Sequence, residues 1–197
     1  AKRAGNEFAF MMQAIQNIEL LKGYEIQKIV TGCPHCFNTL KNEYPELGAD
    51  FEVVHHTQLI NQLIREGRLS LKGGGKFEGK KITFHDPCYL GRANDVYEAP
   101  REVLEKLDAE LVEMKRSKAK GLCCGAGGAQ MFKDAEKGNK EINIERTEDA
   151  IEVNADYIAT GCPFCNTMMT DGIKHFEKEE KVKVLDIAEL ISNAADL

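Results

Sequence analysis

The chain lacks the features that mark several large classes of protein. No apolar run approaches the roughly 18 residues that a membrane-spanning helix requires. The N-terminus has no apolar core of the signal-peptide kind. The net charge is −6 and the basic residues form no stripe, so a nucleic-acid partner is not expected. These absences favour a soluble, cytoplasmic chain without a membrane span of its own.

A disulfide scaffold and an ordinary acid–base enzyme are also poorly supported. Secreted disulfide-rich domains are usually short and have an even number of cysteines, whereas this chain has 197 residues and seven cysteines. No two side chains form a convincing acid–base dyad. The hydrophobic content of 43% and the charged content of 29% are typical of a globular protein with one sizeable core or two small domains.

Five of the seven cysteines occur in an order that is typical of a metal–thiolate centre. They form a lone cysteine, an adjacent pair and a Cys-Pro-Phe-Cys segment, at Cys88, Cys123, Cys124, Cys162 and Cys165. A second Cys-Pro-x-Cys segment stands at Cys33 and Cys36. Thiolates that share a metal are found at short, repeated spacings, and adjacent cysteines suit a reducing compartment better than structural disulfides do. The sequence therefore predicts an iron–sulfur or other metal–thiolate centre.

The two Cys-Pro-x-Cys segments belong to an internal repeat. Residues 29–40 resemble residues 158–169, and residues 53–60 resemble residues 184–191. A helical pattern precedes each copy, at roughly residues 6–22 and 135–153. A repeat of this size indicates duplication of an α/β unit.

Short apolar or β-branched runs alternate with helical patterns along the chain. The predicted strands are residues 27–31, 52–55, 81–85, 110–114, 156–160 and 181–185. A helix is predicted at residues 96–107, where the apolar side chains share one face. This alternation predicts an α/β fold made of two related Rossmann-like units, with mainly parallel strands and flanking helices. The first unit, residues 1–66, is incomplete; residues 67–80 form a linker, and residues 81–197 form a whole second unit.

The cysteines lie where local structure favours thiolates. Proline is preferred at the first position of a helix, so Cys33 and Cys162 are predicted to be N-cap residues. By the same reasoning Asp86 caps a helix that contains Cys88 in its first turn. Helix N-termini lower the pKa of a thiol, and the backbone N–H groups there can donate to sulfur. Gly125 after the cysteine pair allows the backbone to approach closely and opens the next helix.

These motifs carry a family resemblance over essentially the whole chain. The segments that carry it are residues 85–92, His-Asp-Pro-Cys-Tyr-Leu-Gly-Arg, residues 123–128, Cys-Cys-Gly-Ala-Gly-Gly, and residues 161–165, Gly-Cys-Pro-Phe-Cys. They resemble the cysteine-rich CCG domain found in the catalytic component of heterodisulfide reductase and in related iron–sulfur oxidoreductases. The sequence around Cys33 and Val53 is most similar to the membrane-bound group that links electron-transfer flavoprotein to quinone.

The resemblance implies a set of ligands and a cofactor. In that family a full motif can hold a non-cubane [4Fe–4S] cluster, which here implies the five ligands Cys88, Cys123, Cys124, Cys162 and Cys165. The first repeat keeps only Cys33 and Cys36, so its site is incomplete. Those two thiols are free, oxidised to each other or holding an adventitious metal. The resemblance also implies roles beside the ligands for His85 and Gly125, and missing upstream segments that could place the protein at the inner face of a membrane.

Several other residues have ordinary interpretations. His55 and His56 end a strand and are expected to be solvated or satisfied by neighbours. Met11, Met12, Met168 and Met169 fit buried helix faces. Lys118 and Lys120 belong to a solvated loop, and Arg92 either meets an anionic substrate or forms a surface salt bridge.

The leading functional hypothesis is an iron–sulfur oxidoreductase domain that transfers electrons between a flavoprotein and the quinone pool. Its partners would be a redox protein such as an electron-transfer flavoprotein, or other components of a parent oxidoreductase. Three alternatives are open: disulfide reduction at the cluster, a structural zinc module in which zinc replaces iron, and thiol–disulfide exchange at Cys33 and Cys36.

Overall fold

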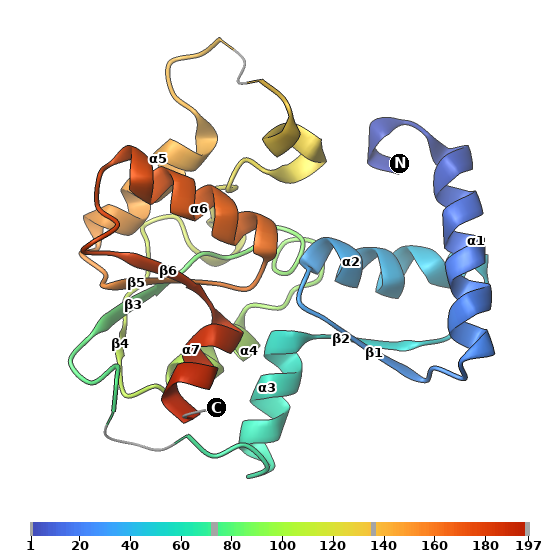
Figure 1. The fold of residues 1–197 in the computed structure, drawn as a ribbon, viewed down its shortest axis with the longest axis horizontal. Coiled ribbons are helices and arrows are strands. Elements are labelled where there is room, and N and C mark those ends of the chain that lie inside the picture. Colours follow the sequence, from blue (N-terminus) through green and yellow to red (C-terminus); the bar gives the residue numbers. More distant parts are fainter. Residues whose placement is uncertain (1, 72–74, 135–136, 196–197) are drawn as a thin grey trace.

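A computed structural model describes residues 2–71, 75–134 and 137–195 of the chain. Helices and strands alternate, as the α/β prediction requires (Figure 1). The strands are β1 (Lys28–Thr31), β2 (Glu52–His55), β3 (Lys81–Phe84), β4 (Glu110–Leu111), β5 (Tyr157–Thr160) and β6 (Lys183–Asp186). The α-helices are α1 (Glu7–Gly23), α2 (Pro34–Asn38), α3 (His56–Arg65), α4 (Glu98–Leu104), α5 (Ile142–Glu152), α6 (Pro163–His175) and α7 (Ile187–Ala195).

The described strands form two sheets, and every pairing in them is parallel. The smaller sheet pairs β1 with β2, and the larger one has the order β4-β3-β5-β6. Parallel pairing needs crossover connections, and the helices between the strands supply them. The α/β class is therefore confirmed.

The internal repeat is visible in the registers of the two sheets. Thr31 of β1 pairs with His55 of β2, and Thr160 of β5 pairs with Asp186 of β6. Each threonine is followed by Gly-Cys-Pro, so both Cys-Pro-x-Cys segments leave their sheet at an equivalent point. The helices after β2 and β6 begin alike as well, because Gln58 accepts from the backbone N–H of His55 at 3.1 Å and Glu189 from that of Asp186 at 2.7 Å.

Helices cover both faces of the larger sheet (Figure 1). One face carries Ile82, Phe84 and Ala159 and packs against α4 and α7, with Ile60 and Ile64 of α3 added from the first repeat. The other face packs Ile158 against Met169 and Ile173 of α6 and Ala150 of α5. The first repeat thus contributes a helix to the core of the second, which fixes the two repeats against each other.

Some element boundaries differ from the predictions. The helix predicted at residues 135–153 begins at Ile142; residues 135–136 lie outside the described part, and residues 137–141 are not helical. Gly138 and Asn139 are poor helix formers, which explains the later start. The helix predicted at residues 96–107 spans Glu98–Leu104 and continues as turns that bury Leu107.

The prediction that Met11 and Met12 are buried was wrong, since each is 46% exposed. Apolar residues occur on most sides of α1, so their spacing does not single out a core face. Its buried residues are Ala14 and Ile18, which pack against Tyr44 and Ala49. Met169, by contrast, is fully buried on α6.

The linker prediction, residues 67–80, falls partly outside the described residues, which exclude 72–74. Phe77 within it is only 2% exposed and packs edge-on against Tyr157, with ring centroids 5.2 Å apart. This part of the segment is anchored to the core of the second repeat.

Candidate metal centre

Five cysteines come shortly after the carboxyl ends of parallel strands, where α/β folds place functional groups: Cys33, Cys36, Cys88, Cys162 and Cys165. Cys123 and Cys124 lie in the longer loop after β4. Cys33 and Cys162 are the N-cap residues of α2 and α6, each followed by proline at the first helical position, as predicted. The two helix starts approach each other, because the His35 ring lies 5.5 Å from the Phe164 ring between centroids. His35 also packs against Tyr89, at 4.5 Å.

The thiols form one continuous series of electrostatic and hydrogen-bonding interactions. Cys88 interacts with Cys123, which interacts with its neighbour Cys124. Cys124 in turn interacts with Cys165, and Cys165 with Cys162. The five cysteines that the sequence singled out are therefore brought together from three separate loops. Cys124, Cys162 and Cys165 are buried, and Cys88 and Cys123 are partly exposed.

The remaining two cysteines join the same series. The Cys33 thiol donates to Cys162, and Cys36 lies beside Cys33. Cys33 is partly buried, whereas Cys36 is exposed. The first-repeat pair therefore lies next to the second-repeat cysteines and does not form a distant site. Sequence order alone did not show this contact, which depends on how the two repeats pack.

Only two of the seven thiols are strongly favoured as thiolates. Donation from Cys124 and Cys88 holds the pKa of Cys123 far below its ordinary value. Donation from Cys165 and Cys33 lowers the pKa of Cys162 to about 4. The donors are correspondingly harder to ionise. Donation to Cys162 raises the pKa of Cys33 to about 11, and donation to Cys123 raises that of Cys124 to about 12.

This proton sharing fits a metal–thiolate centre. Metal ligands must be deprotonated, and several adjacent thiolates repel one another unless a cation lies among them. These sulfurs cannot all ionise without a cation among them. A metal or cluster would supply that cation and bind the sulfurs as ligands. The soft thiolate ligands suit iron–sulfur clusters and zinc.

The backbone after the cysteine pair lies close against the thiols. Gly125 has φ of +90° and donates its N–H to the Cys123 sulfur at 3.3 Å. A Cβ atom at Gly125 would lie 3.3 Å from Cβ of Ile142, so the left-handed conformation and the close approach both favour glycine. The helix predicted to open after it is only partly formed: Gly127–Phe132 has 3-10 turns, but Gly128 and Ala129 within it have φ of +65° and +63° and are not helical.

His85 lies directly beside the thiols at the end of β3. Its ring and the sulfurs of Cys124 and Cys165 offer ligand atoms that all lie within 4.8 Å of one another. His85 is 1% exposed, and burial lowers its pKa to about 3, with the positive charge of Arg146 acting in the same direction. The imidazole is therefore neutral at this site.

Comparison with known proteins now bears on this arrangement. A profile of the cysteine-rich domain called CCG matches residues 1–41 and 82–170. The chain belongs to the CCG cysteine-rich domain family. The matched residues include all seven cysteines, so the profile covers the thiol series described above.

Curated relatives with this CCG domain are iron–sulfur proteins. The chain is 46% identical over 194 residues to the probable iron-sulfur-binding oxidoreductase FadF of Bacillus subtilis, covering 98% of this chain and 27% of the relative. It is 41% identical over 202 residues to EtfAB:quinone oxidoreductase of Syntrophomonas wolfei, covering 100% and 28%. It is 36% identical over 192 residues to one component of the CoB–CoM heterodisulfide reductase of Methanosarcina barkeri, covering 93% and 44%. The chain thus spans less than half the length of these oxidoreductases.

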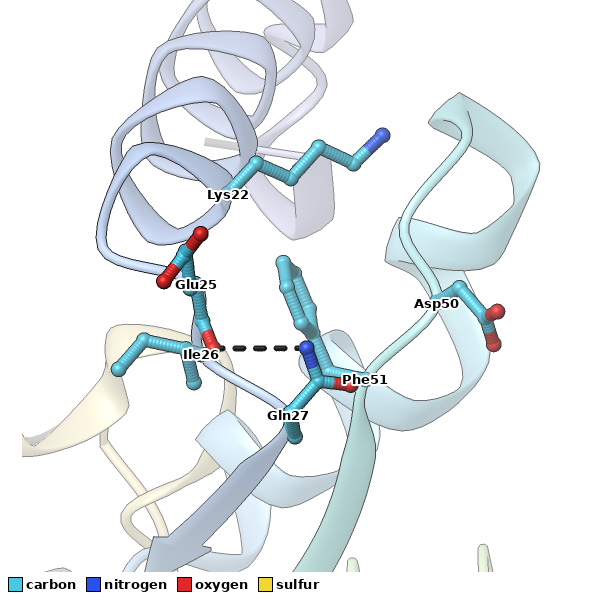
Figure 2. A pocket seen from close by; sticks show the side chains of 6 residues that line it. All are labelled: Lys22, Glu25, Ile26, Gln27, Asp50 and Phe51. Carbon is cyan, nitrogen blue, oxygen red and sulfur yellow. Dashed lines mark hydrogen bonds between the residues drawn. The ribbon is translucent and has the colours of Figure 1, made fainter.

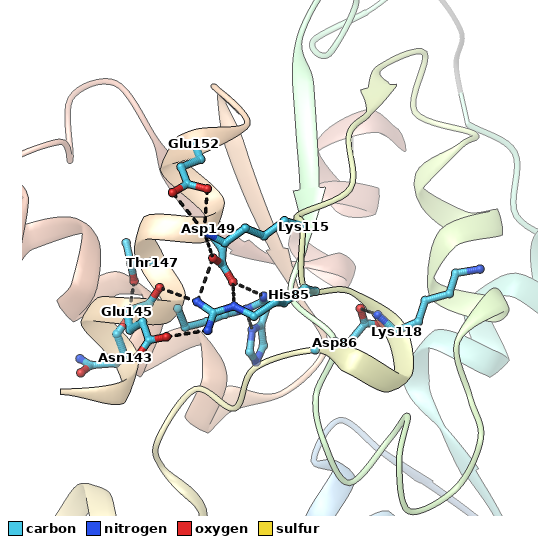
Figure 3. Close-up of polar contacts among 12 residues, drawn as sticks. His85, Asp86, Lys115, Lys118, Asn143, Glu145, Thr147, Asp149 and Glu152 are labelled. Carbon is cyan, nitrogen blue, oxygen red and sulfur yellow. Dashed lines mark hydrogen bonds and ion pairs between the residues drawn. The ribbon is translucent and has the colours of Figure 1, made fainter. Parts of the chain in front are cut away.

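Sequence reasoning missed a buried arginine beside the thiols. Arg146 on α5 is completely buried and donates from Nε to Nδ1 of His85 at 3.0 Å. Its Nη1 donates to the Arg116 carbonyl at 2.7 Å and to Asp149 Oδ2 at 3.2 Å. Figure 3 shows His85 and Asp149 within this network of polar contacts. Arg116 makes a bidentate pair with Asp149, at 2.6 and 2.9 Å. The sequence did contain one signal for this arginine: Arg146 and Asp149 form a charged pair on the inward face of a helical pattern.

The prediction that Asp86 caps a helix was wrong. Residues 88–94 form successive turns, and Asp86 accepts from Arg101 Nη1 and Nη2 at 2.8 and 3.0 Å. It also accepts from the backbone N–H of Lys118 at 2.7 Å. Arg101 arrives from α4 and also pairs with Glu113. Asp86 therefore connects the Cys88 loop to the segment that leads to Cys123.

The remaining polar candidates have structural partners. Arg92 donates to the Gly121 carbonyl at 2.6 Å, which braces the same two loops against each other. Lys118 pairs with Glu98 at the surface, in agreement with a solvated loop. His55 is fully buried, its Nδ1 lies 2.8 Å from Thr57 Oγ1, and burial lowers its pKa to about 3. The expectation of a satisfied residue holds at Nδ1, but Nε2 has no partner among the described residues.

Two of the surface pockets among the described residues differ in their relation to the thiols. One, of about 560 Å³, lies at the end of α1 between Lys22 and Phe51 and contains no cysteine (Figure 2). The other, of about 1130 Å³, is bordered by Gly125, Met131 and Met168 and so adjoins the thiols. No described helix has the length and apolarity needed to cross a membrane.

Proposed function

We propose that this chain is the electron-transferring domain of a larger iron–sulfur oxidoreductase. Cys88, Cys123, Cys124, Cys162 and Cys165 would hold a non-cubane [4Fe–4S] cluster. The observation that carries the proposal is the unbroken series of interactions among these five thiols, assembled from three loops, with the buried His85 beside Cys124 and Cys165. Five adjacent sulfurs exceed the four that a tetrahedral zinc site uses.

A bound cluster would supply one-electron redox chemistry. The residues of the chain prepare the site for it. The N–H groups of Cys165 and Phe164 at the start of α6 favour the Cys162 thiolate, and the Gly125 N–H favours that of Cys123. The buried loops exclude water from Cys124, Cys162 and Cys165. Hydrogen bonds to sulfur and low solvent exposure both tune the reduction potential of such a centre.

We further propose the physiological setting. The relative named for EtfAB and quinone supports electron transfer between a flavoprotein and quinone. The cytoplasmic face of a membrane as the place of this reaction is part of the same proposal. The partner would be an electron-transfer flavoprotein or another part of the parent oxidoreductase. Residues 1–66 would be the second half of a first CCG repeat, residues 67–80 a linker, and residues 81–197 a complete second repeat.

The test is anaerobic reconstitution followed by iron, sulfide and zinc analysis and EPR. We expect about four irons per chain for a [4Fe–4S] cluster and a redox-active EPR signal. Cys124→Ser should lose both. Cys36→Ser is the matched control, because Cys36 is exposed and outside the five-thiol set. Stoichiometric zinc without iron uptake would replace this proposal with a structural zinc module.

A second candidate function is disulfide reduction. The similarity to a heterodisulfide reductase favours it, as does the exposure of Cys36 beside the series. Two readouts separate the possibilities. Disulfide reductase activity that disappears in Cys36→Ser while iron content is retained indicates exchange at the first-repeat pair. Activity that follows iron content alone places the chemistry at the cluster.

A further inference from the structure

The protonation pattern of His85 is determined by its neighbour on α5. Arg146 donates from Nε to Nδ1 of His85 at 3.0 Å. A guanidinium group has only donors, so the Nδ1 atom must accept with its lone pair. In a neutral imidazole the proton then resides on Nε2. Nε2 therefore carries a hydrogen and has no free lone pair.

That N–H group is the part of the ring that Arg146 leaves free, and the ring lies beside the thiols. His85 Nε2 is buried and has no hydrogen-bond partner within the described residues. The sulfurs of Cys124 and Cys165 and a ring nitrogen of His85 lie within 4.8 Å of one another, and Nδ1 is occupied by Arg146. A buried N–H without a partner is costly, and an electron-rich sulfur is an acceptor for it.

Arg146 is held firmly enough to impose this arrangement. Its side chain has no exposed surface, and Nη1 is fixed by the Arg116 carbonyl and by Asp149. Asp149 is itself held by the bidentate contact with Arg116. The guanidinium group therefore cannot turn away from His85 without leaving several buried groups unpaired.

The arrangement expected of a histidine ligand is missing here. A metal-bound histidine normally donates its second N–H to a carboxylate or a carbonyl. Asp86 is adjacent in sequence but is occupied by Arg101 and by the Lys118 N–H. Asp149 is occupied by two arginines.

We propose that Arg146 is a positioning residue that holds His85 as an N–H donor to the sulfurs of Cys124 and Cys165 and prevents it from acting as a metal ligand. Donation to sulfur stabilises the more electron-rich state, so it raises the midpoint potential of the centre. The potential effect rests on the proposed cluster, whereas the position of the proton does not.

The first experiment measures the proton without any cluster. Reduced, metal-free protein labelled with ¹⁵N at histidine is examined by long-range ¹H–¹⁵N correlation, and His85→Gln assigns the signal. We expect the His85 proton on Nε2, whereas the exposed His175 should show a mixture of tautomers. Arg146→Met should remove the preference at His85. A proton on Nδ1 in the parent protein overturns the proposal.

The second experiment uses reconstituted protein. Electron–nuclear spectroscopy should find only weak nitrogen coupling to the centre, since a donor is not bonded to iron. His85→Leu should lower the midpoint potential with iron content unchanged, and His85→Gln, which keeps an N–H donor, should lower it less. Strong nitrogen coupling in the parent, or an unchanged potential in His85→Leu, contradicts the proposal.

These two experiments separate this proposal from the proposed function. If no cluster assembles, the cluster assignment fails while the ¹⁵N measurement still decides the role of Arg146. Where Arg146→Met does not fold, the tautomer in the parent protein remains decisive, because Nδ1 protonation is incompatible with the arginine contact.

Discussion

His56 Nε2 lies 2.9 Å from Asp186 Oδ1 and joins the two repeats at the ends of their equivalent strands. His56 follows β2, whose last residue occupies the place that Asp186 occupies in β6. The contact therefore crosses between the repeats close to the point where each Cys-Pro-x-Cys segment begins. Gly32, just before Cys33, has only the His56 Nδ1 atom within 4 Å of a Cβ built upon it.

Removing the contact between His56 and Asp186 should weaken the packing of the two repeats against each other. We expect His56→Phe to lower the free energy of unfolding by about 1.5–3 kcal/mol, the range for a hydrogen bond to a charged group. Asp186→Asn should cost less, because its side chain still accepts from the Ala188 N–H. Urea unfolding of both single variants and the double variant measures the coupling. A coupling energy near zero would show that the contact does not hold the repeats together.

Gly172 should not tolerate a side chain. A Cβ atom there would overlap the Thr147 hydroxyl and lie 2.8 Å from its Cβ, where α6 crosses α5. The Thr147 hydroxyl is engaged by the Asn143 carbonyl at 2.8 Å, so it cannot move freely. Gly172→Ala should therefore cost about 1–3 kcal/mol through overpacking. The matched control is Gly23→Ala in α1, where a Cβ meets nothing within 4 Å; equal stability of the two variants would contradict this packing.

Breaking the pair between Asp86 and Arg101 should be more damaging. Their side chains are only 4% and 5% exposed, so the buried Arg101 charge would lose one of its two carboxylate partners and keep only Glu113. We expect Asp86→Asn to destabilise the fold by about 3–5 kcal/mol. Glu98→Gln removes a surface pair with Lys118 and should have little effect. Thermal unfolding compares the two, and a similar melting temperature for both would show that Asp86 is not a structural link.

His55 should make stability depend on acid pH. Burial lowers its pKa from 6.5 to about 3. Between pH 3 and pH 6.5 the unfolded chain therefore binds a proton at His55 that the folded chain does not bind. The contribution of His55 to the free energy of unfolding is complete above about pH 6.5. It falls by roughly 1.4 kcal/mol per pH unit as the pH drops toward 3. His55→Gln should reduce the slope of unfolding free energy against pH by about one proton. An unchanged slope means that His55 does not titrate in this way.

The strands and the cysteine-bearing helix starts followed from local chemistry. Runs such as residues 157–160 favour strands by themselves, and Pro34 and Pro163 determine where α2 and α6 begin. The internal repeat was also visible in the sequence, because both copies keep Thr-Gly-Cys-Pro. These features depend on residues within a few positions of one another.

Predictions failed where a partner distant in sequence changed the outcome. Asp86 was interpreted as a helix cap, but Arg101, 15 positions away, pairs with it. Met11 and Met12 were placed in the core, but α1 buries Ala14 and Ile18. Local propensity contains no information about which face of a helix meets another element.

The sequence by itself therefore determined the α/β class, the repeat, and the cysteine order that predicts a metal–thiolate site. Only the tertiary structure decided that Cys33 interacts with Cys162 and that Arg146 donates to His85 across 61 positions of chain. The physical reason is that strand and cap formation are local, whereas the hydrogen bonds of a buried side chain depend on which elements the core brings together.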